Sequence, residues 1–160
     1  GHGDSVRCVE AVGDGRLFSG SDDCTARLWT DFPRGGRCER TFLGHTFSVI
    51  CLASLQEGNA LATGSVDQTI RIWDTATAVT ITLLQGHTSI VTCLAALGDG
   101  RLVSAAQGTD VRVWDLDDED EPNWRLTTVL AGTSADSHSN SLTCDDLEDA
   151  DPTAMLADTT

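Results

Sequence analysis

Apolar and polar residues alternate in short runs along most of the chain, and the clearest run spans Leu61–Asp74, LATGSVDQTIRIWD. Ile70 and Ile72 share one face of an extended segment, and Arg71 and Trp73 share the opposite face. The polar stretch VDQ in the middle is typical of a tight turn. This segment therefore predicts two antiparallel strands joined by a short turn.

The same pattern occurs twice more, at Leu17–Trp29 and at Leu102–Asp115. The chain's four histidines mark the repeat: an aliphatic residue follows each one by four positions and a cysteine follows it by six. The histidines are His2, His45, His87 and His138, the aliphatic residues Val6, Val49, Val91 and Leu142, and the cysteines Cys8, Cys51, Cys93 and Cys144. The spacings of 43, 42 and 51 residues predict an array of repeated units.

Each of the three complete copies predicts four antiparallel strands and no helix. The expected strands are Ser5–Val12, Arg16–Gly20, Thr25–Thr30 and Cys38–Leu43, then Ser48–Leu55, Ala60–Ser65, Thr69–Asp74 and Thr80–Leu84, then Ile90–Leu97, Arg101–Ala105, Asp110–Asp115 and Trp124–Leu130. A sheet that is apolar on both faces must stack on its neighbours, and a radial stack of such sheets is a β-propeller. We expect blades at 1–43, 44–84 and 85–132.

Residues 133–160 predict either the degenerate start of a fourth blade or an acidic disordered tail. The fold class is therefore all-β, a partial propeller of about three and a half four-stranded blades forming an open arc. Unpaired edges at both ends of such an arc favour self-association. The first residue is Gly1 and the only methionine is Met155, which is typical of a piece of a longer protein.

The repeated motif, GH, then V-x-C, then [ST]-G-S-x-D-x-T-x-R-x-W-D, resembles that of the WD-repeat β-propellers. The second copy carries all of it, from Gly44-His45 to Trp73-Asp74. The first copy ends in Thr30 in place of the aspartate, and the third has Gly108 in place of the turn aspartate. The fourth copy keeps His138, preceded by Ser137, and lacks the later tryptophan.

The resemblance implies a buried hydrogen-bonded relay of histidine, serine or threonine, aspartate and tryptophan in each blade. The relay residues would be His2, Ser19, Asp23 and Trp29, then His45, Thr63, Asp67 and Trp73, then His87, Ser104 and Trp114. We expect intact relays in the first two copies and a looser turn in the third, because Gly108 offers no carboxylate.

Two chemical alternatives are weaker than this structural interpretation. Recurring histidine, serine and aspartate suggest a hydrolase triad, but a nucleophile is used once, whereas this set recurs and includes a tryptophan. Histidine and cysteine suggest a zinc site, but an extended segment from His45 to Cys51 separates the side chains by roughly 15–20 Å. The GDGR segments are hairpin turns without a following helix to cap a phosphate. We therefore expect no catalytic residue, no metal site and no cofactor, and we expect the four cysteines of the repeat to be small buried residues.

The net charge of −15 argues against nucleic acid and anionic membranes as partners. Six of the seven residues at Asp115–Glu121 are acidic, which is typical of a solvated loop. Proteins or peptides are therefore the expected partners. Free thiols throughout favour a reducing, cytoplasmic or nuclear location.

Partner-binding residues are expected on the loops before each first strand and between each second and third strand, which share one face in WD-repeat proteins. The candidates are Asp22, Phe47, Val66, Ile90 and Gln107. Phe47 and Ile90 are apolar at turn positions, either as anchors for a partner or as packing against the next blade. The sequence thus predicts a non-catalytic protein-interaction scaffold. The alternative is the substrate-recognition or regulatory propeller of a larger multidomain protein, such as a ubiquitin ligase component or a signalling enzyme.

Overall fold

The computed structural model describes residues 1–13, 15–31, 34–108, 110–117 and 123–131. These residues form three antiparallel sheets of four strands each, in the strand orders β1-β2-β3-β4, β5-β6-β7-β8 and β9-β10-β11-β12. The predicted fourth copy, residues 133–160 with His138, lies outside the described residues. We refer to the three sheets as blades 1, 2 and 3.

The strand bounds lie close to those expected from the alternating pattern. Blade 1 contains β1 (Val6–Ala11), β2 (Leu17–Ser21), β3 (Thr25–Thr30) and β4 (Arg37–Leu43). Blade 2 contains β5 (Val49–Leu55), β6 (Ala60–Ser65), β7 (Ile70–Asp74) and β8 (Thr80–Leu84). Blade 3 contains β9 (Val91–Ala96), β10 (Leu102–Ala106), β11 (Asp110–Asp117) and β12 (Asn123–Ala131).

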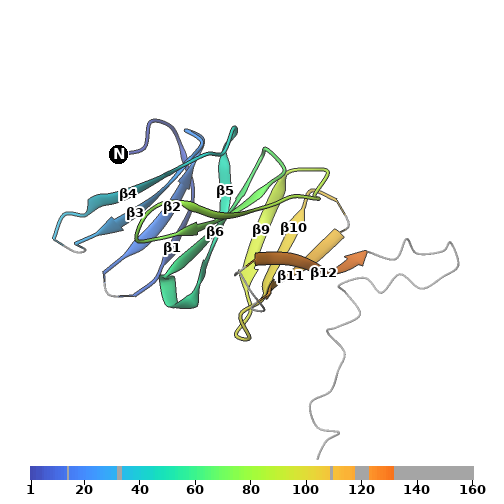
Figure 1. Ribbon diagram of the computed structural model, residues 1–160. Coiled ribbons are helices and arrows are strands. Elements are labelled where there is room, and N and C mark those ends of the chain that lie inside the picture. The colour runs from blue at the N-terminus through green and yellow to red at the C-terminus, as the bar shows by residue number, and fades with distance from the viewer. Residues whose placement is uncertain (14, 32–33, 109, 118–122, 132–160) are drawn as a thin grey trace, which may run out of the picture.

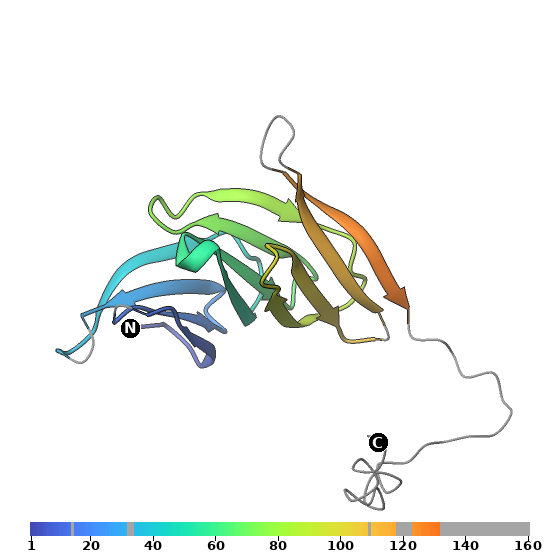
Figure 2. The same cartoon turned by 90° about the horizontal axis from the view of Figure 1, so that it is seen from below.

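The blades stand side by side in chain order and do not close into a ring (Figures 1 and 2). The first strands of successive blades contact each other, β1 with β5 and β5 with β9, so these are the inner strands. The fourth strands lie at the outer edge of each sheet. The predicted fold class, an open arc of four-stranded antiparallel blades, is confirmed for the described residues.

Two details differ from the sequence expectation. A single 3-10 turn, η1 (Gln56–Gly58), joins β5 to β6 where no helical residues were expected. Part of the acidic run is also not a loop, because Asp115–Asp117 continue strand β11. Arg125 stands opposite Asp115 in the register, and an opposite charge across the strands offsets the acidic character of this edge.

The hydrophobic core lies between the blades. One buried cluster joins blades 1 and 2 and includes Phe18, Phe42, Leu61 and Trp73, and the other joins blades 2 and 3 and includes Ile72, Leu102 and Trp114. Neighbouring blades therefore pack face to face, and blade 2 is covered on both of its faces. This explains why strands such as β6 are buried along their whole length.

A glycine on the second strand of blade 1 and of blade 2 lets the inner strands of neighbouring blades approach. A Cβ on Gly64 would lie 2.4 Å from the Cys51 sulfur and 2.8 Å from a Val91 methyl, and a Cβ on Gly20 would meet the equivalent Cys8 and Val49. Cys51 also donates to the carbonyl of Val91 at 3.4 Å. The cysteine of one blade, the glycine beside it and the valine of the next blade thus interlock.

The fourth repeat cysteine, Cys144, lies outside the described residues, and of the other three the expectation of burial holds for one. Cys51 is buried and Cys8 is half-buried, but Cys93 is exposed. Cys93 stands opposite Ala105 instead of a glycine, on the side of blade 3 that no described residue covers. Its burial depends on a following blade, which the described part of the chain does not supply.

Candidate functional site

The relay residues of the first two blades come together. In blade 2, Thr63 lies between two partners: Nε2 of His45 is 2.8 Å from the Thr63 hydroxyl, and the Trp73 indole N–H donates to the same oxygen at 2.8 Å. Nδ1 of His45 lies 2.8 Å from Oδ2 of Asp67.

Blade 1 repeats this arrangement with different residues. His2 lies 2.6 Å from the Ser19 hydroxyl and 2.9 Å from Asp23, and the Trp29 indole donates to Ser19 at 2.7 Å. Each turn aspartate also accepts a backbone N–H from the residue after the histidine, Gly3 in blade 1 and Thr46 in blade 2. The relay therefore ties the loop before the first strand to the turn between the second and third strands.

Burial and hydrogen bonds shift the pKa values within the relay of blade 2. Burial lowers the pKa of His45, and the nearby Arg71 lowers it further against the opposing effect of Asp67. Burial acts to raise the pKa of Asp67, but hydrogen bonds from Thr69 and His45 outweigh it and hold that pKa below its usual value. The ionised aspartate beside a neutral imidazole is thus the favoured state.

Blade 3 has only the inner half of the relay. His87 lies 2.7 Å from the Ser104 hydroxyl, and Trp114 donates to Ser104 at 2.8 Å. Gly108 stands where blades 1 and 2 have the turn aspartate, and the charge of Asp110 acts on His87 instead. A hollow of about 190 Å³ lies there, lined by His87, Gln107 and Gly108 among others.

The five expected partner-binding residues lie at the same end of the strands. We call this end the loop face; it consists of residues 3–5, 46–48 and 88–90 and the turns at 22, 66 and 107. One backbone hydrogen bond joins the two loops of every blade: Asp22 N–H to Ser5 O at 2.9 Å, Val66 N–H to Ser48 O at 3.0 Å, and Gln107 N–H to Ile90 O at 2.8 Å. The loop face is therefore supported by main-chain contacts in all three blades.

The side chains on this face differ in exposure. Phe47 is 59% exposed, and Gln107 is also exposed. Ile90, Val66 and Asp22 are half-buried. Of the three apolar candidates, Phe47 therefore presents the largest fraction of its surface to solvent, whereas Val66 and Ile90 pack partly against their surroundings.

Two polar clusters at the junction of blades 1 and 2 have no signal in the sequence pattern. Asp22 pairs with Arg7, whose hydrogen bond holds the pKa of that carboxyl below its usual value, with a further contribution from Ser48 of blade 2. The Glu10 carboxylate accepts from the backbone N–H of Ser54 at 3.0 Å and from its hydroxyl at 2.6 Å. Blade 3 offers Ala96 at the position of Ser54, so this polar link belongs to the first junction alone.

Within the described part of the chain, no three His, Cys, Asp or Glu residues are grouped so as to hold a metal ion. None of the described helical segments has the length and apolar character needed to cross a bilayer.

The repeats match a known family model. The model described as "WD domain, G-beta repeat" matches residues 1–30, 36–74 and 78–115, well over half of the chain. The chain belongs to the WD-repeat family. The resemblance that the Gly-His and Trp-Asp motifs predicted is thereby confirmed.

Relatives share this segment at moderate identity. The chain is 36% identical over 118 residues to "U3 small nucleolar RNA-associated protein 15 homolog" of Xenopus tropicalis, covering 72% of this chain and 22% of that protein. It is 36% identical over 120 residues to "Nuclear distribution protein nudF" of Aspergillus flavus, covering 72% and 26%. The chain thus spans about a quarter of the length of these relatives.

A solved structure has the same fold. The WD40 β-propeller domain of Doa1 superposes with a TM-score of 0.69 at 26% sequence identity, over 83% of this chain and 43% of that one. The open arc of this chain therefore corresponds to less than half of that domain.

Proposed function

We propose that the chain is part of a non-catalytic interaction platform that holds protein or peptide partners on its loop face. The observation that carries this is Phe47, a large apolar side chain, 59% exposed, on a loop whose backbone is fixed from both sides. The Ser65 hydroxyl donates to the Phe47 carbonyl at 3.1 Å, and Val66 N–H donates to Ser48 O. An exposed aromatic on a rigid loop binds at low cost in conformational entropy.

The geometry of the relay supports a structural role for its histidines, serines and aspartates. The Ser19 hydroxyl is buried and already engages both His2 and Trp29, and Thr63 does the same in blade 2. A hydroxyl that is held in this way has no path to a substrate. We therefore interpret the relay as support for the loop face, without a catalytic role.

The charge of the chain supports the proposed class of partner. The net charge of −15 disfavours phosphate backbones and anionic lipid surfaces, so proteins and peptides are the proposed partners. The five described cysteines are all free thiols, which supports a reducing cytoplasmic or nuclear setting. A role as the recognition or regulatory propeller of a larger protein stays a prediction, which the sequence on either side of these residues would test.

The test compares affinity capture by the wild-type chain, Phe47→Asp and Val79→Asp. Val79 is the matched control because it is 61% exposed but lies at the opposite end of the strands. We expect Phe47→Asp to lose partners that both other proteins retain, with melting temperatures alike for all three. Equal capture by Phe47→Asp and wild type would contradict the proposal.

A further inference from the structure

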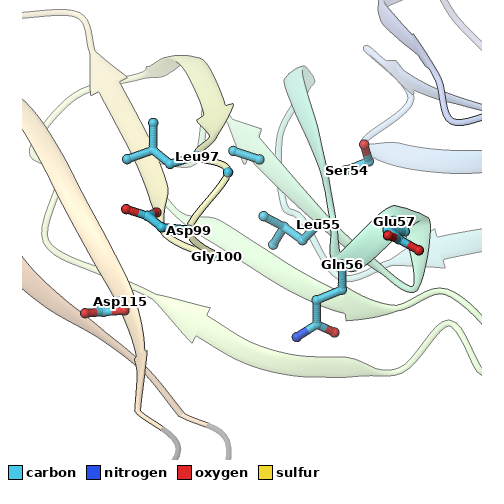
Figure 3. A pocket seen from close by; sticks show the side chains of 10 residues that line it. Ser54, Leu55, Gln56, Glu57, Leu97, Asp99, Gly100 and Asp115 are labelled. Carbon is cyan, nitrogen blue, oxygen red and sulfur yellow. The ribbon is translucent and has the colours of Figure 1, made fainter.

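Blade 3 borders a larger and a smaller hollow, at opposite ends of its strands. The larger one, of about 510 Å³, lies between blades 2 and 3 at the end opposite to the loop face (Figure 3). Its acids do not converge, because Glu57 lies across the hollow from Asp115, and Asp99 is already held by Arg101. The smaller one, of about 190 Å³, lies on the loop face, and several hydrogen-bonding groups of blade 3 line it. The smaller hollow is therefore the better candidate for a binding site.

In blade 2 the corresponding place holds the carboxylate of Asp67, which four hydrogen-bond donors surround. Nδ1 of His45 lies 2.8 Å from Oδ2, and the N–H of Thr46 donates to the same oxygen at 3.1 Å. The N–H and the hydroxyl of Thr69 donate to Oδ1 at 3.0 Å and 2.6 Å. Blade 1 repeats all four contacts around Asp23. In both blades the chain thus arranges its donors around one internal carboxylate.

Blade 3 keeps two of these donors, on His87 and Thr88, but has Gly108 in place of the aspartate. Nε2 of His87 lies 2.7 Å from the Ser104 hydroxyl, which accepts from Trp114 and can donate its own proton to this nitrogen. The ring hydrogen is then left on Nδ1. Within the part of the chain that the structure describes, neither this Nδ1 nor the Thr88 N–H has a hydrogen-bond acceptor. Two donors therefore face the hollow.

The opposite wall of the hollow has changed from donor to acceptor. Asp110 stands four residues before the tryptophan of its blade, where blades 1 and 2 have Thr25 and Thr69. Its carboxylate lines the hollow, and Arg112 lies 4.0 Å from it, which partly balances its charge. A carboxylate entering the hollow would be repelled by Asp110, and a cation would compete with Arg112. A neutral group that both accepts and donates hydrogen bonds fits these walls best.

We propose that this hollow binds the carboxamide of a glutamine side chain of a protein partner. Its oxygen accepts from Nδ1–H of His87 and from the Thr88 N–H, and its NH₂ group donates to the Asp110 carboxylate. A carboxylate can accept about four hydrogen bonds, so Asp110 has capacity for this one beside the contacts it already makes. Glutamine fits better than the shorter asparagine because His87 is only 8% exposed. The inference rests on the proposed role of the loop face and names the chemistry that blade 3 recognises there.

The experiment titrates the purified chain with three peptides and follows its chemical shifts by NMR. The peptides are acetyl-Gly-Gly-X-Gly-Gly-N-methylamide with glutamine, glutamate or methionine at X, and the methyl group avoids a second primary carboxamide. We expect the glutamine peptide to shift resonances of Thr88, Gln107 and the His87 ring, and the other two peptides to bind at least about fivefold more weakly. Glutamate or methionine binding as tightly as glutamine, or no localised shift with glutamine, would overturn the proposal.

One substitution should reverse the preference between the peptides. Asp110→Thr returns the residue type of Thr25 and Thr69 and leaves donors on both walls of the hollow. The glutamate peptide should then bind at least about threefold more tightly than the glutamine peptide. The control is Glu57→Gln, which removes an acid at the opposite end of the strands and should keep the wild-type order. A preference for glutamine that persists in Asp110→Thr would overturn the proposal.

A second variant fills the hollow from within. Gly108→Asp returns the turn carboxylate of blades 1 and 2 to its place beside His87 and should remove the binding of the glutamine peptide. Binding that persists in a folded Gly108→Asp chain would overturn the proposal, and if this variant does not fold, the Asp110→Thr comparison decides alone. The peptide titration does not involve Phe47, so its failure is distinguishable from a failure of the loop face to capture partners.

Discussion

The indole N–H of Trp73 donates to the hydroxyl of Thr63 at 2.8 Å, and both residues are almost completely buried between blades 1 and 2. The Trp73 ring also lies 5.7 Å from the Phe42 ring of blade 1, and the Arg71 guanidinium stacks over it. One side chain therefore joins the relay of its own blade to the core that it shares with the preceding blade.

Substitution of Trp73 should cost far more stability than the same substitution of Trp29. Both indoles donate to the relay hydroxyl of their blade, but Trp29 is half-buried on a face that no described residue covers. We expect Trp73→Ala to lower the free energy of unfolding by about 3–5 kcal/mol and Trp29→Ala to lower it by clearly less. Urea unfolding followed by circular dichroism measures both. Equal losses would show that the hydrogen bond, and not interblade packing, sets the cost.

The strands and their stacking could be predicted from the sequence because they depend on alternation within each copy. Thr25–Thr30 and Ala60–Ser65, for example, form strands with the expected bounds. The turn of Gln56–Gly58 was missed, since its non-glycine residues Gln56 and Glu57 adopt positive φ and carry no composition signal for it.

The details of the site depend on contacts between blades, which no local pattern encodes. Glu10 and Ser54 are 44 residues apart, and neither residue type indicates the other as its partner. Ile90 and Phe47 are both apolar residues at turn positions, but the exposed fractions of their side chains differ because the neighbouring surfaces differ.

Gly64→Ala should destabilise the junction between blades 2 and 3. The added methyl would lie under 3.0 Å from both the Cys51 sulfur and Val91, so one of the inner strands must move. Overpacking of this kind typically costs about 1–3 kcal/mol. Gly98→Ala is the matched control, because a Cβ there meets nothing within 4 Å. Thermal and urea unfolding of the two variants should separate them, and a Gly64→Ala protein as stable as Gly98→Ala would be inconsistent with the interlock.

Acid should weaken the fold, beginning just below neutral pH. Burial lowers the pKa of both His45 and His87, so the unfolded chain, with histidine pKa values of about 6.5, binds protons more readily than the folded chain. The stability these groups contribute is therefore full above about pH 6.5 and is lost as the pH falls below it, by at most about 1.4 kcal/mol per pH unit for each histidine. The lowered pKa of Asp67 extends the loss into the range below about pH 4.

Urea unfolding at pH values from 8 to 5 measures this dependence. The control is His87→Gln, in which an amide replaces one titrating ring beside Ser104. In this variant the slope of the unfolding free energy against pH should be smaller by up to about 1.4 kcal/mol per pH unit, the equivalent of one bound proton. A wild-type stability that stays level or rises between pH 7 and pH 5 would exclude the neutral-imidazole arrangement.

The chain should self-associate through the open ends of the arc. The outward face of blade 1 carries Val9, which is 68% exposed, and the half-buried Trp29. Leu52 and Trp73 hold the equivalent positions in blade 2. The outward face of blade 3 is the opposite one and carries the exposed Cys93. Stacking the first of these faces on the second in another copy would bury apolar surface as the internal junctions do, and the contact is head-to-tail. Light scattering should give a mass above 17.0 kDa that rises with concentration. Val9→Lys should lower it, because a charge would be buried in the contact, whereas Val79→Lys at a distant turn should not. A constant monomer mass at all concentrations would rule out this association.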